Sequence, residues 1–142
     1  MKSDTKLFAA RVENLSAVNA FVEKCADRFG LDAKKKFGLL LALEEAFVNI
    51  CSYAYPDGEG AAEVSCECCA AGFVMEISDK GSPFDVLSLP DPDTTSEIMD
   101  RQVGGLGIHF IRTLSDRVSY RRENGHNVLR MEFNHTLVDG AA

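Results

Sequence analysis

Two polar residues stand one helical turn apart at the end of an apolar, helix-like segment. Glu45 and Asn49 belong to the stretch ALEEAFVNICSYAYP, residues 42–56, which follows three consecutive leucines. Residues i and i+4 share one face of a helix, so both side chains project from the same edge. The neighbouring stripe, which we expect to be buried, consists of Leu39, Leu43, Ala46 and Ile50. A polar pair at the border of a core is either a solvated edge or part of a binding site.

A carboxylate ends the apolar face of a predicted strand. Alternation along the strand places Asp79 on the same face as Phe73, Met75 and Ile77. A carboxylate in that position costs free energy unless hydrogen-bond donors meet it. Asp79 therefore either caps a turn or accepts a hydrogen bond from a ligand, such as the exocyclic amine of adenine, which guanine lacks at that position. Gly81 would allow a ring to approach the backbone closely.

A glycine-rich segment, Gly104-Gly105-Leu106-Gly107, directly precedes a predicted helix. Glycines free the backbone to turn its N–H groups toward an anion, and the N-terminus of a helix adds positive potential. The alternative is an ordinary flexible hinge. The segment is not a P-loop, because no Gly-Lys-Ser/Thr follows it, and the chain has no protein-kinase signature.

Periodicity and turn signals predict the helices and strands that carry these residues. We expect a weakly alternating strand over 6–12, a helix from Asn14 or Ser16 to about 29, and a longer helix from a cap at Asp32 to about 55. Strands are predicted over 62–70, 73–79, 117–122 and 128–134, with a helix starting near 106. The irregular stretch over 82–105 is typical of a functional lid or of a disordered segment. This order predicts one α+β domain over 1–142, a two-layer sandwich of a mixed, mostly antiparallel sheet with helices on one face.

Composition restricts the functional classes. The 142 residues are 46% hydrophobic and 26% charged, as in a soluble globular protein. A net charge of −7 argues against direct nucleic-acid binding. Without a secretory signal or a long apolar run, we expect a cytoplasmic protein that does not enter a membrane. Cys66 and Cys68 should face the side of their strand opposite to Cys69, so we expect reduced, structural cysteines rather than a metal site.

The order and spacing of these motifs resemble the GHKL family of ATP-binding domains, which has the Bergerat-type fold. The resemblance spans nearly the whole chain, and within the family it is strongest to the anti-sigma-factor serine kinases. The stretches that carry it are Glu45-Ala46-Phe47-Val48-Asn49, Tyr53-Ala54-Tyr55-Pro56, Asp79-Lys80-Gly81-Ser82-Pro83-Phe84-Asp85 and Gly104-Gly105-Leu106-Gly107-Ile108. Two positions depart from the family pattern. Tyr53 stands where a His is common, and Gly125-His126-Asn127-Val128 stands where Gly-Thr is more usual, the Thr supporting the adenine-binding Asp.

The resemblance implies a site for ATP and Mg²⁺. It assigns Asn49 to the metal ion, Asp79 to adenine and Glu45 to the proton of an attacking hydroxyl. It also implies that a lid over about 85–104 closes on the phosphates and that Arg101 neutralises charge on the γ-phosphate. The remaining implied nucleotide contacts are Gly81, Phe84, Gly104, Gly105, Leu106 and Gly107.

The function that the resemblance implies is that of an anti-sigma factor with serine/threonine protein kinase activity. Such a protein sequesters a sigma factor, phosphorylates an anti-anti-sigma (STAS-type) protein on serine, and forms a homodimer. Two alternatives remain open: an ATP-binding regulatory module that holds a partner without transferring phosphate, and a catalytic subunit that acts with a separate histidine phosphoacceptor. His109 is expected to be a surface or packed residue rather than a phosphoacceptor.

Overall fold

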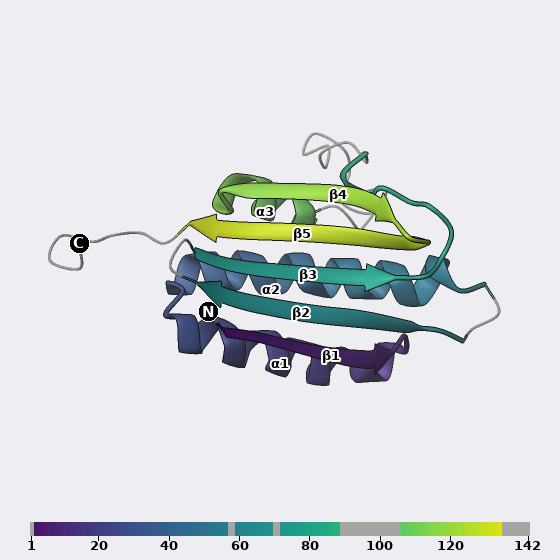
Figure 1. Cartoon of the computed structure of the whole chain (residues 1–142), viewed down its shortest axis with the longest axis horizontal. Helices are drawn as coiled ribbons and strands as arrows, with labels where there is room; N and C mark the ends of the chain where they lie inside the picture. The colour runs from purple at the N-terminus through teal and green to yellow at the C-terminus, as the bar shows by residue number, and fades with distance from the viewer. Residues whose placement is uncertain (1, 57–58, 70–71, 89–105, 135–142) are drawn as a thin grey trace, which may run out of the picture.

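The computed structural model describes residues 2–56, 59–69, 72–88 and 106–134, which form five strands and three α-helices (Figure 1). Their bounds are β1 (Lys2–Ala9), α1 (Leu15–Phe29), α2 (Ala33–Asn49), β2 (Ala61–Cys69), β3 (Gly72–Asp79), α3 (Leu106–Leu114), β4 (Arg117–Glu123) and β5 (His126–Asn134). Three short turns accompany them: η1 (Val12–Asn14), η2 (Ile50–Ala54) and η3 (Val86–Ser88).

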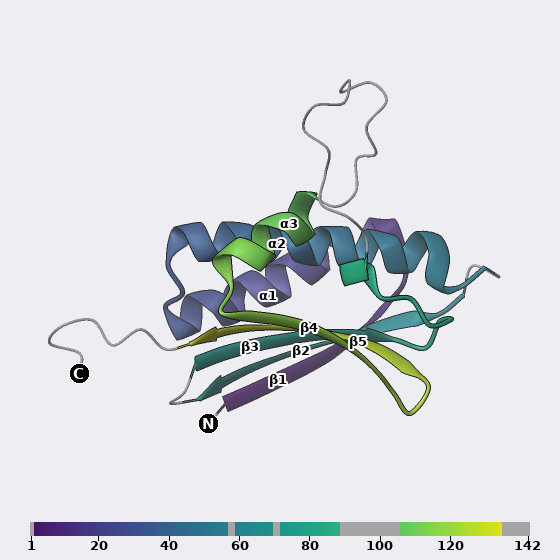
Figure 2. The ribbon, with the colours of Figure 1, turned by 90° about the horizontal axis from the view of Figure 1, so that it is seen from above.

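The strands form one sheet in the order β1-β2-β3-β5-β4, and every neighbouring pair is antiparallel. The three helices cover one face of this sheet, while the other face is open (Figure 2). The α+β prediction of two layers with helices on one face is confirmed, and all pairings are antiparallel where the prediction allowed a mixed sheet.

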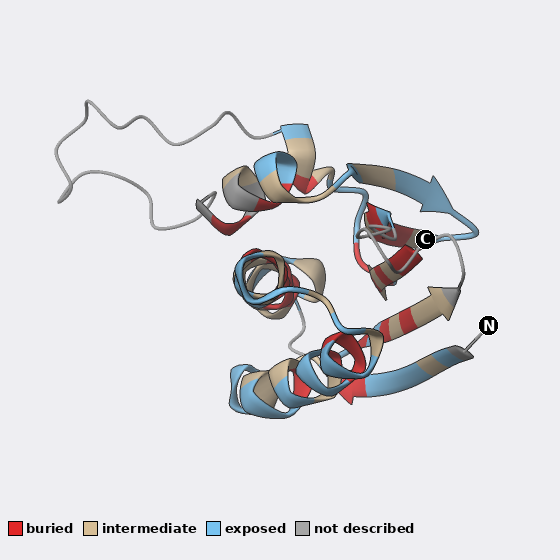
Figure 3. Ribbon diagram, turned by 90° about the vertical axis from the view of Figure 1, so that its left-hand side faces the viewer, coloured by how far each residue is buried: buried red, intermediate tan, exposed pale blue. Residues whose placement is uncertain are grey.

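The core lies between the two layers, where the buried positions of helices and strands face one another (Figure 3). Alternate residues of β3 and β5 point into it, among them Phe73, Met75 and Phe133. Cys66, on β2, is buried in the same layer, as expected for a structural cysteine. Burial, together with the neighbouring Cys25, raises the pKa of the Cys66 thiol far above its ordinary value.

The central helix begins and ends where the sequence predicts. The carboxylate of Asp32 accepts a hydrogen bond from the backbone N–H of Lys35 at 2.8 Å and so caps α2. The preceding helix ends at Gly30, whose φ of 87° is a left-handed conformation that favours glycine. α2 then continues as the π-helical turn η2, which stops before Tyr55.

One helix of the described chain, spanning Ala33–Ala54, is long and apolar enough to cross a membrane by length and composition alone. Core helices of globular proteins meet the same criterion. Here the segment packs against α1 and α3 over the inner face of the sheet.

Two strands differ from the prediction by two or more residues at a boundary. The first strand covers Lys2–Ala9 rather than 6–12, and Val12 belongs to η1. Its alternation is a weak signal because Phe8 is its one buried hydrophobic residue among those described. The last strand begins at His126, two residues earlier than predicted. The turn before it is formed by Asn124 and Gly125, which have φ values of 51° and 80°.

Candidate functional site

A cavity of about 280 Å³ lies between the end of α2 and the adjoining ends of β3 and β5. At this end of the core, polar side chains line the space between the two layers beside apolar ones. Its lining is mostly apolar, with a few polar groups that point inward, as is typical of small-molecule sites. The lining residues are Ala46, Asn49, Ile50, Tyr53, Ala54, Ile77, Asp79, Ser82, Pro83, Phe84, Val86, Tyr120, Asn127 and Leu129.

Asp79 is the carboxylate of this cavity and is only 7% exposed. Its Oδ1 atom accepts two hydrogen bonds, from the backbone N–H of Gly81 at 2.8 Å and from the Nδ2 amide of Asn127 at 3.0 Å. Within the described residues, no ion pair involves Asp79. The negative charge is therefore met by neutral donors, all on one oxygen.

Gly81 is buried directly behind this carboxylate. A Cβ atom at Gly81 would lie 2.6 Å from the carbonyl oxygen of Ala54, so the glycine allows the loop after β3 to pack against η2. Arg122 donates a hydrogen bond from Nη1 to the carbonyl of Gly81 at 2.7 Å. Gly81 thus fixes the loop by its close approach to Ala54.

Asn49 and two aromatic residues complete the cavity wall. Asn49 is half-buried and lines the cavity from the last turn of α2. Tyr53 and Phe84 stand at the rim, with 72% and 45% of their surfaces exposed. The structure therefore brings three of the sequence-predicted site residues, Asn49, Asp79 and Phe84, to one cavity.

Glu45 lies one turn from Asn49 but contacts a different element. Its Oε1 atom accepts a hydrogen bond at 2.9 Å from the backbone N–H of Gly107, in the first turn of α3. Gly107 is packed against α2, because a Cβ atom there would lie 2.5 Å from the carbonyl oxygen of Leu41. A carboxylate at a helix N-terminus is stabilised by the unpaired N–H groups and the helix dipole. Glu45 therefore ties α3 to α2 beside the cavity.

Most of the other predicted contacts lie outside the described residues. Arg101, Gly104 and Gly105 lie outside the described residues, as do residues 89–100 of the predicted lid. Leu106 opens α3, and the description does not include its side chain.

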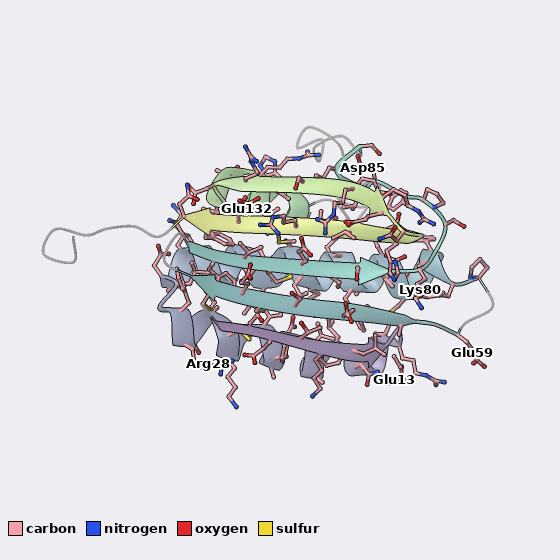
Figure 4. All side chains as sticks on the ribbon, in the orientation of Figure 1. Glu13, Arg28, Glu59, Lys80, Asp85 and Glu132 are labelled. Carbon is pink, nitrogen blue, oxygen red and sulfur yellow. The ribbon has the colours of Figure 1, made fainter. Side chains whose placement is uncertain are left out.

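The described start of the predicted lid, 85–88, is folded. Val86 is buried in the cavity wall, and Asp85 caps η3 by accepting a hydrogen bond from Leu87 N–H at 2.8 Å (Figure 4). Arg112, on α3, donates a hydrogen bond to the carbonyl of Leu87. The segment that enters the lid is thus held by the helix layer.

The sequence reasoning assigned no role to three residues of the site: Asn127 and Tyr55, which it quoted only within longer stretches, and Tyr120. Asn127 is 7% exposed and is the cross-strand partner of Asp79. Tyr120 lines the cavity and donates a hydrogen bond from its hydroxyl to Asn127 Oδ1 at 2.6 Å. The predicted strand 128–134 began one residue after Asn127, so Asn127 was assigned to no strand.

Tyr55 acts from outside the cavity. Its hydroxyl donates to the carbonyl of Ala61 at 2.6 Å and accepts from the backbone N–H of Lys80 at 2.8 Å. Lys80 directly follows Asp79 at the end of β3 (Figure 4). Tyr55 therefore links the segment after η2 to the starts of β2 and of the loop that carries Gly81.

Comparison with known families agrees with this geometry. The model of the histidine kinase-like ATPase domain matches residues 8–133. That match covers both helices before the cavity, the strands that carry Asp79 and Asn127, and α3. The chain belongs to the family of histidine kinase-like ATPase domains.

Several proteins that are similar to this chain in sequence are named as protein kinases. The chain is 29% identical over 134 residues to the serine/threonine-protein kinase BtrW of Bordetella bronchiseptica, with 92% of this chain and 94% of the relative covered. It is 30% identical over 132 residues to the serine-protein kinase RsbW of Bacillus pumilus, with 87% and 81% covered. It is 29% identical over 120 residues to RsbW of Halalkalibacterium halodurans, with 82% and 74% covered.

Proposed function

We propose that this protein binds ATP with Mg²⁺ and transfers the γ-phosphoryl group to a serine of a protein antagonist, as an anti-sigma factor with kinase activity. The observation that carries the proposal is the cavity that joins Asn49, Asp79 and Phe84 in a histidine kinase-like ATPase domain. The names of the relatives, serine and serine/threonine protein kinases, support the choice of serine as acceptor. The family resemblance supports a sigma factor and a STAS-type antagonist as partners, a homodimer, and a cytoplasmic location.

The residues at the cavity fit an adenine nucleotide. An exocyclic amine needs an acceptor, and the Asp79 carboxylate offers one in an apolar setting formed by Ile77 and Leu129. The exposed rings of Tyr53 and Phe84 would cover the base, since aromatic side chains stack on any planar π-system.

The donor set also fits Mg²⁺. This ion commonly takes one or two protein oxygens and completes its octahedron with water and phosphate oxygens. The amide oxygen of Asn49 would be that protein ligand. Bound ATP and its ion would supply the phosphoryl group to be transferred.

The chain's own residues would then orient the attacking serine hydroxyl and take its proton. Phosphoryl transfer depends mainly on positioning and charge stabilisation, with a group that takes the proton of the attacking hydroxyl. Glu45 would be that group, one helical turn from Asn49. Its hydrogen bond to Gly107 N–H at 2.9 Å would hold the carboxylate in a fixed orientation.

The same hydrogen bond supports the alternative, an ATP-binding module that sequesters a partner without phosphate transfer. If Glu45 serves only to join α3 to α2, its carboxylate is structural. Nucleotide binding would then alter the α2–α3 contact and so the affinity for the partner, without chemistry.

The deciding experiment is single-turnover phosphorylation of a STAS-type antagonist at saturating ATP, with the variant Glu45→Gln. Glutamine still offers an oxygen to Gly107 N–H but does not act as a base. We expect transfer to fall about 10²–10⁴-fold while nucleotide affinity stays near wild type. The matched control is Glu44→Gln, the same change at the exposed neighbouring position, which should transfer at the wild-type rate.

Nucleotide affinity can be measured by tyrosine fluorescence. The chain has three tyrosines and no tryptophan, and Tyr53 and Tyr120 line the cavity while Tyr55 bonds beside Asp79. Tyrosine emission should therefore respond to ADP.

A Glu45→Gln protein with wild-type transfer would end the general-base assignment. No transfer by the wild type, with ATP still changing sigma-factor affinity, would favour the alternative.

A further inference from the structure

One buried amide joins three parts of the cavity. Asn127, at the start of β5, makes four hydrogen bonds through its side chain. Nδ2 donates to Asp79 Oδ1 at 3.0 Å and to the carbonyl of Ser82 at 2.8 Å. Oδ1 accepts from the backbone N–H of Phe84 at 3.0 Å and from the hydroxyl of Tyr120 at 2.6 Å. Both N–H groups of the amide nitrogen therefore donate, and the amide oxygen accepts two hydrogen bonds.

The partners leave only one chemical choice for this side chain. Its nitrogen faces two acceptors, Asp79 Oδ1 and a carbonyl, while its oxygen faces the N–H donor of Phe84 and a hydroxyl. A carboxylate would face Asp79 and the Ser82 carbonyl without a proton to donate. A threonine hydroxyl has one proton and cannot donate to both. An amide alone satisfies all four partners.

The contacts also fix the orientation of Asp79. Its Oδ1 receives two N–H donors, from Asn127 and from Gly81, so two separate segments hold the carboxylate in place. A carboxylate that accepts hydrogen bonds in this orientation favours a base that donates one at this point. At the same time, the hydrogen bond to Phe84 N–H holds the segment 82–84, which forms the cavity wall on the lid side.

We propose that Asn127 is a positioning residue that sets base specificity: its single amide holds the carboxylate of Asp79 as an acceptor and fixes the wall at Phe84. The inference deepens the proposed nucleotide binding and rests on it. It gives this chain a device that differs from the threonine more usual in the family, because the amide couples the base-reading carboxylate to the segment that leads into the lid.

The first test is Asn127→Asp, which keeps size and shape but removes the donor to Asp79. Two carboxylates at hydrogen-bond distance share one proton at low pH and repel when both are ionised. We expect ADP affinity near wild type at about pH 5.5, where the shared proton restores the donor, and at least about tenfold weaker at about pH 8.5. Wild-type affinity should change little between these values. The control is Asn134→Asp, the same change at the exposed end of β5.

The second test stays informative if Asn127→Asp fails to fold. Asn127→Thr and Asn127→Val have the same shape, suit a strand, and both lose the bonds to Ser82 and Phe84. They differ in one hydroxyl that can donate to Asp79. We expect the threonine variant to bind ADP about tenfold more tightly than the valine variant and to keep the preference for ADP over GDP.

Calorimetric titration with ADP and GDP separates the outcomes. If the wild type binds ADP, equal affinities for the threonine and valine variants, or an Asn127→Asp protein with wild-type affinity at both pH values, overturn the positioning role alone. If the wild type binds no adenine nucleotide, the proposed function itself fails, whatever the variants do.

Discussion

Two carboxylates on the same strand meet different kinds of partner on the two faces of the sheet. Asp79 and Glu76 both lie on β3, and each faces a polar partner directly across on β5: Asn127 for Asp79 and Arg130 for Glu76. Asp79 points to the helix-covered face, where it is buried, and Glu76 to the open face of the sheet. The strand pair is the same, but the chemistry of the partners is not.

On the open face the charge is neutralised. Glu76 Oε2 accepts hydrogen bonds from Nη1 of Arg121 and Nη1 of Arg130, each at 2.9 Å (Figure 4 shows the side chains of this face, with Glu132 labelled). Arg130 also bonds Glu132 at 3.0 Å. Partial burial acts to raise the pKa of Glu76, but the hydrogen bonds from the two arginines outweigh it, so the pKa lies below its ordinary value. The charge of Glu76 is therefore paired directly with two cations.

On the buried face the charge is held but not neutralised. Asp79 receives neutral N–H donors, and no described cation pairs with it. Burial of a carboxylate without a neighbouring cation costs free energy of folding, and Asp79 is buried in this way beside a cavity. A ligand that donates a hydrogen bond would offset it. Among the described residues, the two carboxylates therefore differ in whether a cation pairs with them.

The largest expected effect comes from exchanging each carboxylate for its amide. Asp79→Asn replaces an acceptor with a group that presents a donor to adenine or to Asn127. We expect ADP affinity to fall by on the order of 10–100-fold, which corresponds to about 1–3 kcal/mol. Glu76→Gln, the same change on the opposite face of the same strand, should leave ADP affinity unchanged. Calorimetric titration of both variants measures the difference.

GTP serves as the second ligand in that experiment. The wild type should prefer ATP, because guanine lacks the amine at the position that Asp79 reads, and Asp79→Asn should lose this preference. Equal affinity of the wild type for ATP and GTP, or a loss of affinity in Glu76→Gln as large as that in Asp79→Asn, would contradict the assignment of the two faces.

A smaller effect is expected at the anchor beside Asp79. Tyr55→Phe removes the hydroxyl that bridges the Ala61 carbonyl and the Lys80 N–H, and it leaves the half-buried carbonyl and the exposed N–H without that partner. We expect a loss of about 1–2 kcal/mol in the free energy of unfolding, and a decrease in ADP affinity of less than about tenfold. Urea unfolding and ADP titration give the two values. Tyr53→Phe, the same change on an exposed ring at the rim, is the control and should keep wild-type stability.

The site could be predicted from sequence where its residues lie on strongly periodic elements. Asp79 was found because it ends the apolar row of Phe73, Met75 and Ile77. The same signal marks Asn127, which ends the row formed by Leu129, Met131 and Phe133. It was missed because the predicted strand began at residue 128, so the row lost its polar end. An earlier strand start would have predicted two polar ends on one face.

Other features depend on contacts between distant segments, which periodicity does not report. The pairing of Asp79 with Asn127 requires the order β3-β5, in which strands that are not consecutive in sequence become neighbours. The bond from Gly107 N–H to Glu45 joins residues 62 positions apart, and it requires the close approach of α3 to α2. Tyr55 fits a loop motif equally well whether or not its hydroxyl bonds to Lys80. The fold class could be predicted, since the order of elements alone restricts it.

The smallest effect concerns the open face and its response to acid. Because the pKa of Glu76 is lowered in the folded protein, the unfolded chain binds the proton more readily, and stability from the Glu76 charge is lost as the pH falls through the folded pKa. The contribution should be below about 1 kcal/mol, since the arginines are partly exposed and screened by solvent and salt. Glu76→Gln should therefore be slightly less stable than wild type at about pH 7, and the gap should narrow toward about pH 3.5. Glu63→Gln, on the exposed face of β2, is the control for a carboxylate without arginine partners among the described residues. Urea unfolding of the three proteins at both pH values decides it: a gap between wild type and Glu76→Gln that stays constant on acidification would show that the pKa of Glu76 is not lowered in the folded state. High salt should shrink the same gap at neutral pH, while leaving the effect of Asp79→Asn on ADP affinity largely intact, because a buried hydrogen bond is screened far less than an exposed ion pair.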